Sequence, residues 1–167
     1  IAAIMIAVTT VFTLLVCVPI PATQGYVNFS DVATFFSGFT FGPWLGFVGG
    51  GIGASLADLL GGYPQFALVT LFAHGLQGLV AGALGRGKKL PGMILAWLGG
   101  AAAMIGIYLV GEALFLRMGW GPALAEVPPN LLQNVVGGLV GIPLFYAVRR
   151  AYPPITRMGQ PGEWTEG

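Results

Sequence analysis

Charge is scarce in this chain of 167 residues, because Asp, Glu, Lys and Arg together make up 8% of it and apolar residues make up 56%. Soluble domains carry about 25% charged residues, so the composition excludes an ordinary soluble domain. The interior of a bilayer instead demands an apolar exterior and backbone groups that are hydrogen-bonded within the chain. We therefore expect an all-α membrane protein.

Reactive side chains and catalytic motifs are equally scarce. Cys17 is the single cysteine and His74 the single histidine, so neither a disulfide framework nor a Cys/His metal site is expected. Neither H-E-x-x-H nor G-x-S-x-G occurs, and no Walker A motif is present to bind ATP. The net charge of +1 comes without a basic stripe. We expect no enzyme, no cofactor and no nucleic-acid partner.

What the chain does contain is a series of apolar segments, most of them close to the 20 or so residues that cross a bilayer as a helix. Prolines divide them, since Pro43 suits the first turn of a helix better than its interior. The six predicted spans are residues 1–18, 31–41, 43–60, 64–84, 91–116 and 129–148. The sequence thus predicts a six-helix transmembrane bundle over residues 1–150, followed by a Pro- and Gly-rich tail over residues 151–167 with little structure.

The basic residues predict the orientation of this bundle. Arg117 alone lies in a loop on one side, and the other six follow the fourth and sixth spans: Arg86, Lys88, Lys89, Arg149, Arg150 and Arg157. Because loops rich in Lys and Arg stay in the cytoplasm, both termini should be cytoplasmic. The loops at residues 19–30, 61–63 and 117–128 should then face outward, and the tail should be cytoplasmic.

Polar side chains gather in the outer halves of the last three spans. Such groups are costly in a membrane unless they face the bundle interior or a wet cavity. Their spacings of three or four residues place those of each span on one helix face. His74 and Gln77 lie roughly halfway across, whereas Glu112, Asn130 and Asn134 share a depth near the outer mouth, which favours a pocket there. Alternatively they only hydrogen-bond to one another, and His74 in particular could be a satisfied buried imidazole. The residues are His74, Gln77, Glu112, Asn130 and Asn134, with Tyr108 and Gln133 beside them.

Two further carboxylates have simpler explanations. Ser30 and Asp31 are favoured near helix starts, so we expect Asp31 to cap the second span rather than to contact a ligand. Asp58, at the end of the third span, is expected to be structural. His74 and Glu112 could form a proton relay, but we expect them to lie at different depths.

Small residues at every fourth position mark close helix contacts within membranes. Gly46, Gly50 and Ala54 form such a row in the third span. Ala3 and Ala7 form a shorter one in the first span, where they could serve an internal contact or a docking face for another membrane subunit.

Residues 19–87 carry a set of motifs that resembles a known family. They are PIPATQGYVNFSD, FGPWLG, ADLL and HGLQGLVAG. Together they resemble the substrate-binding S-components of energy-coupling factor (ECF) transporters, most closely the riboflavin-type group. The resemblance implies a multi-pass protein of a prokaryotic cell membrane that binds a vitamin or related micronutrient beneath its first outer loop. Riboflavin, a pyridoxine-type compound, a thiamine precursor and a queuosine precursor all fit.

The resemblance also implies particular residues and partners. The ligand would contact the first outer loop and the fourth to sixth spans. Ala3 and Ala7 match the A-x-x-x-A motif by which such proteins dock onto a membrane coupling subunit that carries two ATPases, and the S-component would deliver its ligand by toppling. The competing hypotheses are a standalone facilitator or proton-coupled carrier that uses Glu112 and His74, and a membrane enzyme or structural subunit. The implied binding residues are Tyr26, Asn28, His74, Gln77, Glu112, Asn130 and Asn134.

Overall fold

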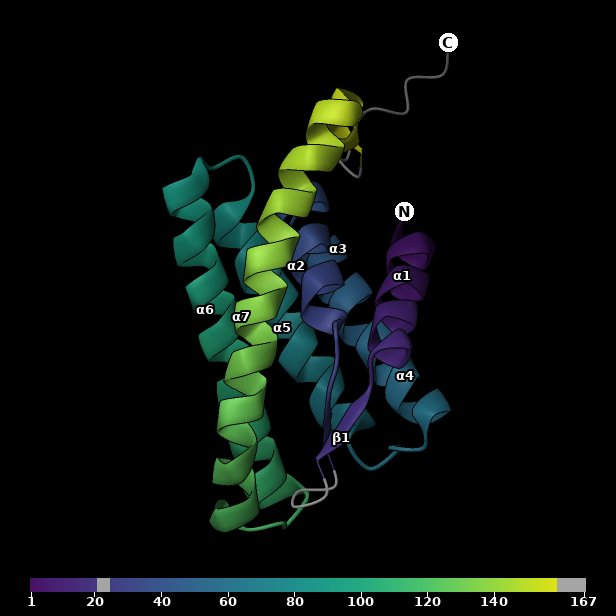
Figure 1. The fold of residues 1–167 in the computed structure, drawn as a ribbon, viewed down its shortest axis with the longest axis vertical. Coiled ribbons are helices and arrows are strands. Elements are labelled where there is room, and N and C mark those ends of the chain that lie inside the picture. The colour runs from purple at the N-terminus through teal and green to yellow at the C-terminus, as the bar shows by residue number, and fades with distance from the viewer. Residues whose placement is uncertain (21–24, 159–167) are drawn as a thin grey trace.

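A computed structural model describes residues 1–20 and 25–158 as a bundle of helices with one short hairpin (Figure 1). The first half contains α1 (Ala2–Leu15), β1 (Val18–Ile20), β2 (Gly25–Val27), α2 (Ser30–Phe41), α3 (Pro43–Phe47), the π-helical turn η1 (Val48–Ile52) and α4 (Gly53–Gly61). The second half contains α5 (Ala67–Gly85), α6 (Leu90–Val110), the π-helical turn η2 (Gly111–Phe115), α7 (Trp120–Ala151) and the 3₁₀ turn η3 (Pro153–Arg157).

The prediction of an all-α membrane protein is confirmed for the described residues, apart from the hairpin. Four continuous helices are long and apolar enough to cross a membrane, namely Pro43–Gly61, Ala67–Gly85, Leu90–Phe115 and Trp120–Ala151. The other two predicted spans correspond to α1 and α2, which are shorter at 14 and 12 residues. The count of six spans and the cytoplasmic side of the termini therefore stay predictions.

The hairpin lies within the segment that the sequence predicts as the first outer loop. Its strands pair antiparallel, with Val18 opposite Val27 and Ile20 opposite Gly25. Val and Ile favour extended backbone, which accounts for strands at this position. In Figure 1 the hairpin lies at one end of the bundle, whereas the start of α1 and the last turns of α7 lie toward the other.

The last long helix begins earlier than predicted. The sequence analysis started it at Pro129, yet α7 runs from Trp120 through Pro128 and Pro129 without a break. A proline inside a helix removes one hydrogen bond and costs about 3 kcal/mol, but membrane helices tolerate this where neighbouring helices pack against them. The extension turns most of a predicted loop into two further helical turns.

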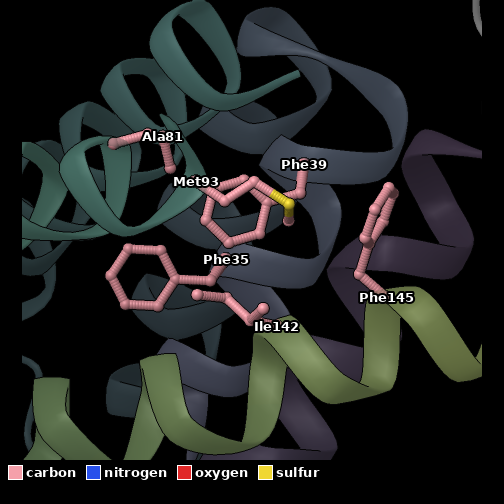
Figure 2. Close-up of a cluster of buried hydrophobic side chains, with 7 residues drawn as sticks. Phe35, Phe39, Ala81, Met93, Ile142 and Phe145 are labelled. Carbon is pink, nitrogen blue, oxygen red and sulfur yellow. The ribbon is translucent and has the colours of Figure 1, made fainter. Parts of the chain in front are cut away.

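An apolar cluster of side chains from α2, α5, α6 and α7 lies inside the bundle (Figure 2). Close helix contacts at glycine support it: a side chain at Gly78 of α5 would overlap the backbone of Gly46 in α3, and one at Gly46 would overlap Gly78. The predicted role of Gly46 in a close contact is thus confirmed. The tail residues Pro153–Arg157 form a 3₁₀ turn, and residues 159–167 lie outside the described part. The cluster contains Phe35, Phe39, Ala81, Met93, Ala96, Ile142 and Phe145.

Candidate functional site

A pocket lies between the hairpin and six helical segments. Its empty space, with the open mouth included, is about 400 Å³. β2, α1, α4, α5, η2 and α7 all contribute to its wall, as does the end of α6. Of the seven binding residues predicted from the sequence, five line this pocket: Tyr26, Asn28, His74, Glu112 and Asn130.

Helical periodicity explains how so many polar groups reach one cavity. On α7, Glu126, Asn130 and Gln133 recur at intervals of four and three residues and all line the pocket. On α6 and its continuation η2, Tyr108 and Glu112 are four residues apart, and on α5, Thr70 and His74 repeat the same spacing. Each set lies on one helix face, so the pocket is the place where these faces meet.

Three carboxylates face the pocket and are almost completely shielded from solvent. Asp58 is 2% exposed, Glu112 2% and Glu126 5%. The Tyr26 hydroxyl donates a hydrogen bond to Asp58 Oδ1. Asp58 Oδ2 and Glu112 Oε2 are buried and have no hydrogen-bond partner among the described residues. Such groups are expensive to leave unsatisfied.

Tyr26 belongs to β2 and lies outside the membrane-spanning helices. Burial and the neighbouring Asp58 carboxylate both raise the pKa of the Tyr26 phenol far above its usual range. The phenol therefore stays protonated and serves as a donor to Asp58. Its ring also lies 4.5 Å, centroid to centroid, from that of Tyr63.

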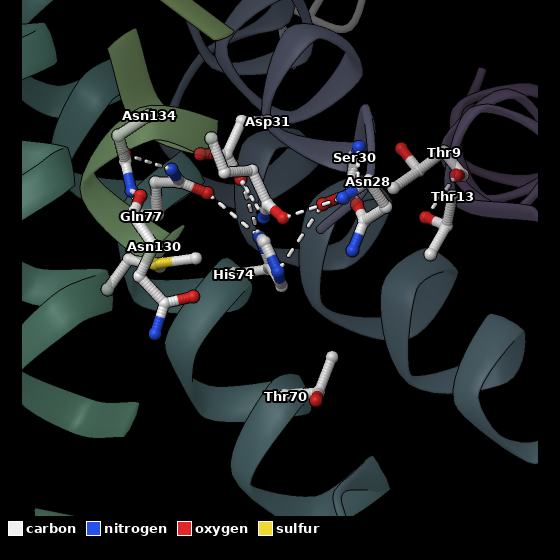
Figure 3. A network of polar contacts seen from close by, with 12 residues as sticks. Thr9, Thr13, Asn28, Ser30, Asp31, Thr70, His74, Gln77, Asn130 and Asn134 are labelled. Atoms are coloured by element: carbon white, nitrogen blue, oxygen red, sulfur yellow. Dashed lines mark hydrogen bonds and ion pairs between the residues drawn. The ribbon is translucent and has the colours of Figure 1, made fainter. Parts of the chain in front are cut away.

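Gln77 and Asn134, the other two predicted residues, lie behind the pocket wall and do not line it. They belong to a hydrogen-bonded network that reaches back to His74 (Figure 3). Asn134 Nδ2 donates to the Asn130 carbonyl at 3.0 Å, which leaves its Oδ1 to accept from Gln77 Nε2 at 2.7 Å. Gln77 Oε1 is then an acceptor, and it lies 3.0 Å from His74 Nδ1.

The orientation of these amides fixes the proton on the imidazole. His74 Nδ1 faces Gln77 Oε1 and also Asp31 Oδ1, at 3.2 Å. Because both neighbours are acceptors, Nδ1 carries hydrogen. The other nitrogen, Nε2, lies 3.3 Å from the Ser30 hydroxyl. His74 is therefore a buried, fully engaged side chain that also borders the pocket.

A second branch of the network fastens the hairpin to α7. Gln133 Oε1 accepts from the backbone N–H of Asn28 at 2.9 Å, and Gln133 Nε2 donates to Asp31 Oδ1 at 3.2 Å. Asn28 Oδ1 in turn accepts from the N–H of Ser30 at 2.8 Å. The end of β2, the start of α2 and the middle of α7 are thus held together by side-chain amides.

The expected role of Asp31 is wrong. The N-cap residue of α2 is Phe29, and Asp31 makes no capping hydrogen bond; it instead pairs with His74 and Gln133. Asp58, which the sequence analysis expects to be structural, lines the pocket and accepts a hydrogen bond from the Tyr26 hydroxyl. Asp31 itself is completely buried and lies behind the pocket wall.

Glu126 stands out among the pocket residues that sequence reasoning did not assign to the site. Glu126 was placed in an outer loop, since the prolines at 128 and 129 suggested a helix start. Its spacing of four residues before Asn130 and seven before Gln133 is the signal that could have placed it on the same face. Among the described residues, no group of three His, Cys, Asp or Glu side chains is arranged to hold a metal ion.

The described residues thus form a helix bundle with four helices of membrane-spanning length and a small polar pocket beside the hairpin. Residues 1–150 match the family described as the S component of the ECF-type riboflavin transporter. The chain belongs to this family. It is an integral protein of the plasma membrane and a substrate-binding subunit of a transporter, not an enzyme.

Similar proteins agree with this assignment. The chain is 39% identical over 148 residues to an uncharacterized protein of Pyrococcus woesei, a match that covers 87% of this chain and 97% of the relative. It is 35% identical over 136 residues to the thiamine precursor transporter HmpT of Lactococcus lactis subsp. cremoris strain MG1363, covering 81% and 77%. A solved S component of a bacterial ECF transporter shares the fold, with a TM-score of 0.72, 21% identity and coverage of 90% and 94%.

Proposed function

We propose that the protein binds a vitamin or related micronutrient in the pocket beneath the hairpin and delivers it when docked on an ATP-driven ECF coupling module. The observation that supports this most is that the hairpin and three long helices form a polar pocket in a chain whose family consists of transport substrate-binding subunits. Tyr26, Asn28, His74, Glu112 and Asn130 would contact the ligand. Gln77 and Asn134 would hold His74 and α7 in position.

Docking is proposed to use the outward face of α1. Ala3 and Ala7 are both exposed there, whereas Met5, Thr9 and Thr13 are buried against the bundle. Two small side chains four residues apart let another membrane helix approach closely. The partners would be a transmembrane coupling subunit and two ATPases, and delivery would occur by toppling of the 1–150 domain in the bilayer. Residues 151–167 would form a cytoplasmic tail.

The ligand is the first property to measure. Native mass spectrometry of the protein purified in detergent, with identification of the released small molecules, should yield a micronutrient. Riboflavin, pyridoxine-type compounds, a thiamine precursor and a queuosine precursor form the starting panel; the Lactococcus relative is named for a thiamine precursor. Binding measured on wild type and Glu112→Gln links the molecule to the pocket. Protein that releases nothing, and that no panel member stabilises against heat, would count against a binding role.

A standalone proton-coupled carrier is the second candidate. The expectation that His74 and Glu112 lie at different depths does not prevent a relay, because both line one pocket together with Asp58 and Glu126. The double substitution Ala3→Leu/Ala7→Leu separates the two functions. An S-component should lose assembly with the coupling module and uptake while its ligand affinity stays unchanged. Uptake that survives the double substitution would favour the carrier.

A further inference from the structure

The pocket has a strongly one-sided charge, which restricts the chemistry of its ligand. Asp58, Glu112 and Glu126 line it, whereas no Lys or Arg lines it. We infer that the ligand is a small, flat nitrogen heterocycle that presents amino or protonated ring nitrogens to Asp58 and Glu112 and carries neither phosphate nor carboxylate. This inference rests on the proposed function and narrows it.

Unsatisfied oxygens, more than the acidic character alone, carry the inference. Asp58 Oδ2 and Glu112 Oε2 belong to side chains that are 98% buried and line the cavity, and neither has a partner in the described part of the chain. A buried carboxylate without a donor is strongly destabilising. A ligand with two N–H donors would satisfy both oxygens through charge-assisted hydrogen bonds, which are the strongest kind available in such a site.

No cation of the protein can take the place of such a ligand. The seven Lys and Arg residues all lie outside the pocket wall, and residues 21–24, which lie outside the described part of the chain, have the sequence PATQ and include no charged residue. His74 is the one titratable base in the wall, and its Nδ1 is already engaged by Asp31 and Gln77. Positive charge on His74 would therefore balance Asp31, and it would leave Asp58 Oδ2 and Glu112 Oε2 without a hydrogen-bond partner in the described part of the chain.

Aromatic side chains and the size of the cavity define the shape of the ligand. Tyr26, Phe66 and Tyr108 line the pocket beside the carboxylates. Such rings stack on flat heterocycles and attract cationic ones. The empty space between these side chains is about 400 Å³, and this figure includes the open mouth, so the enclosed part is smaller. A single ring with short substituents matches this space better than three fused rings with a long polyol chain.

The experiment uses two series of small molecules. Within each series the ring scaffold is kept and its charge or its hydrogen-bond donor is changed. The first is 4-amino-5-hydroxymethyl-2-methylpyrimidine, its 4-oxo analogue and its phosphate ester. The second is pyridoxamine, pyridoxine and 4-pyridoxic acid. Dissociation constants are measured by calorimetry on the full chain in detergent. The amino member of at least one series should bind, and its oxo, carboxylate or phosphate counterpart should bind roughly 10- to 100-fold more weakly, as expected for loss of a hydrogen bond to a charged group.

Variants test whether the carboxylates are responsible. Glu112→Gln and Asp58→Asn keep the shape and remove the charge, and each should weaken the amino compound by roughly 10-fold or more while leaving the oxo analogue nearly unaffected. Ser55→Ala is the control, because Ser55 lies on α4 near Asp58 but hydrogen-bonds to the Ala67 carbonyl and does not line the pocket. Its affinity should equal that of wild type, and thermal unfolding of all variants checks their folding.

Three outcomes overturn the inference. The first is equal or tighter binding of the oxo, carboxylate or phosphate member, which leaves the proposed function standing. The second is unchanged affinity of the amino compound in Glu112→Gln and Asp58→Asn. The third is no binding by any compound of either series. In that case the proposed function falls as well only if the purified protein also releases no micronutrient.

Discussion

Gln133 is the residue whose replacement tests the anchoring of the hairpin most directly. In Gln133→Leu the side chain keeps a similar size but can no longer accept from the Asn28 N–H at 2.9 Å or donate to Asp31 Oδ1 at 3.2 Å. Leaving the buried N–H without an acceptor costs about 1–3 kcal/mol, and losing a hydrogen bond to a carboxylate costs a similar amount. Gln133 borders the pocket, so water can reach the freed groups and recover part of this free energy. We expect a net loss of about 3 kcal/mol.

Two measurements report this loss. The thermal midpoint in detergent should fall by roughly 6–12 °C, from the usual scaling for a chain of this length. If the loss is confined to the hairpin, hydrogen exchange of the Asn28 and Ser30 amides should accelerate by roughly 100-fold, because local opening follows the local free energy. Gln77→Leu is the matched control: it removes an amide from the same network, from α5, and should leave the Asn28 amide protected.

The reasoning would be refuted by unchanged exchange at Asn28 and Ser30 in folded Gln133→Leu. It would also be refuted if Gln77→Leu accelerated exchange at Asn28 as much as Gln133→Leu does, since the two branches of the network would then not be separable.

Three further predictions concern other contacts. In Asn134→Ala the Gln77 amide loses its acceptor, so ligand affinity should fall about 10-fold although residue 134 does not line the pocket. Asn134→Asp keeps the acceptor and should bind the ligand more tightly than the alanine variant. Dissociation constants measured by calorimetry check both expectations. Gly78→Leu should prevent stable folding, because the new side chain would overlap the backbone of Gly46. Size-exclusion chromatography of the purified variant measures this, and a normal monodisperse peak would contradict the prediction. The pKa of Tyr26 is raised in the folded protein, so its contribution to stability is constant below about pH 10, the pKa of an unfolded tyrosine. This contribution is lost as the pH rises from there toward the higher folded value. Alkaline unfolding should therefore begin above pH 10 in wild type and be less steep in Tyr26→Phe.

Much of the fold could be predicted because its causes are local. Apolar length, proline positions and small residues at every fourth position depend on neighbours along the chain, and each predicted span corresponds to a helical segment. The start of α7 could not be predicted in this way. Whether Pro128 ends a helix or lies inside one depends on the packing of neighbouring helices, which the sequence pattern does not reveal.

Part of the lining of the candidate pocket could be predicted from the sequence, whereas the contacts of its residues could not. Spacing identified His74 with Gln77 and Asn130 with Asn134, since residues three or four apart share a helix face. It could not show that Gln77 and Asn134 lie behind the wall, because that depends on how far each helix is rotated. Asp31 was misassigned for a similar reason: its partners, His74 and Gln133, are 43 and 102 residues away in the sequence.

Helix α1 connects the proposed pocket with the proposed docking face. Thr13 lines the pocket, and Thr10 donates to the Gly53 carbonyl of α4 at 2.9 Å, so the inner face of α1 is fixed to the wall that carries Asp58. Ala3 and Ala7 lie on its outer face. A ligand that draws Asp58 inward would therefore also bias the position of α1. Because such coupling is reciprocal, a coupling subunit docked on α1 should change ligand affinity by the same factor as ligand changes docking.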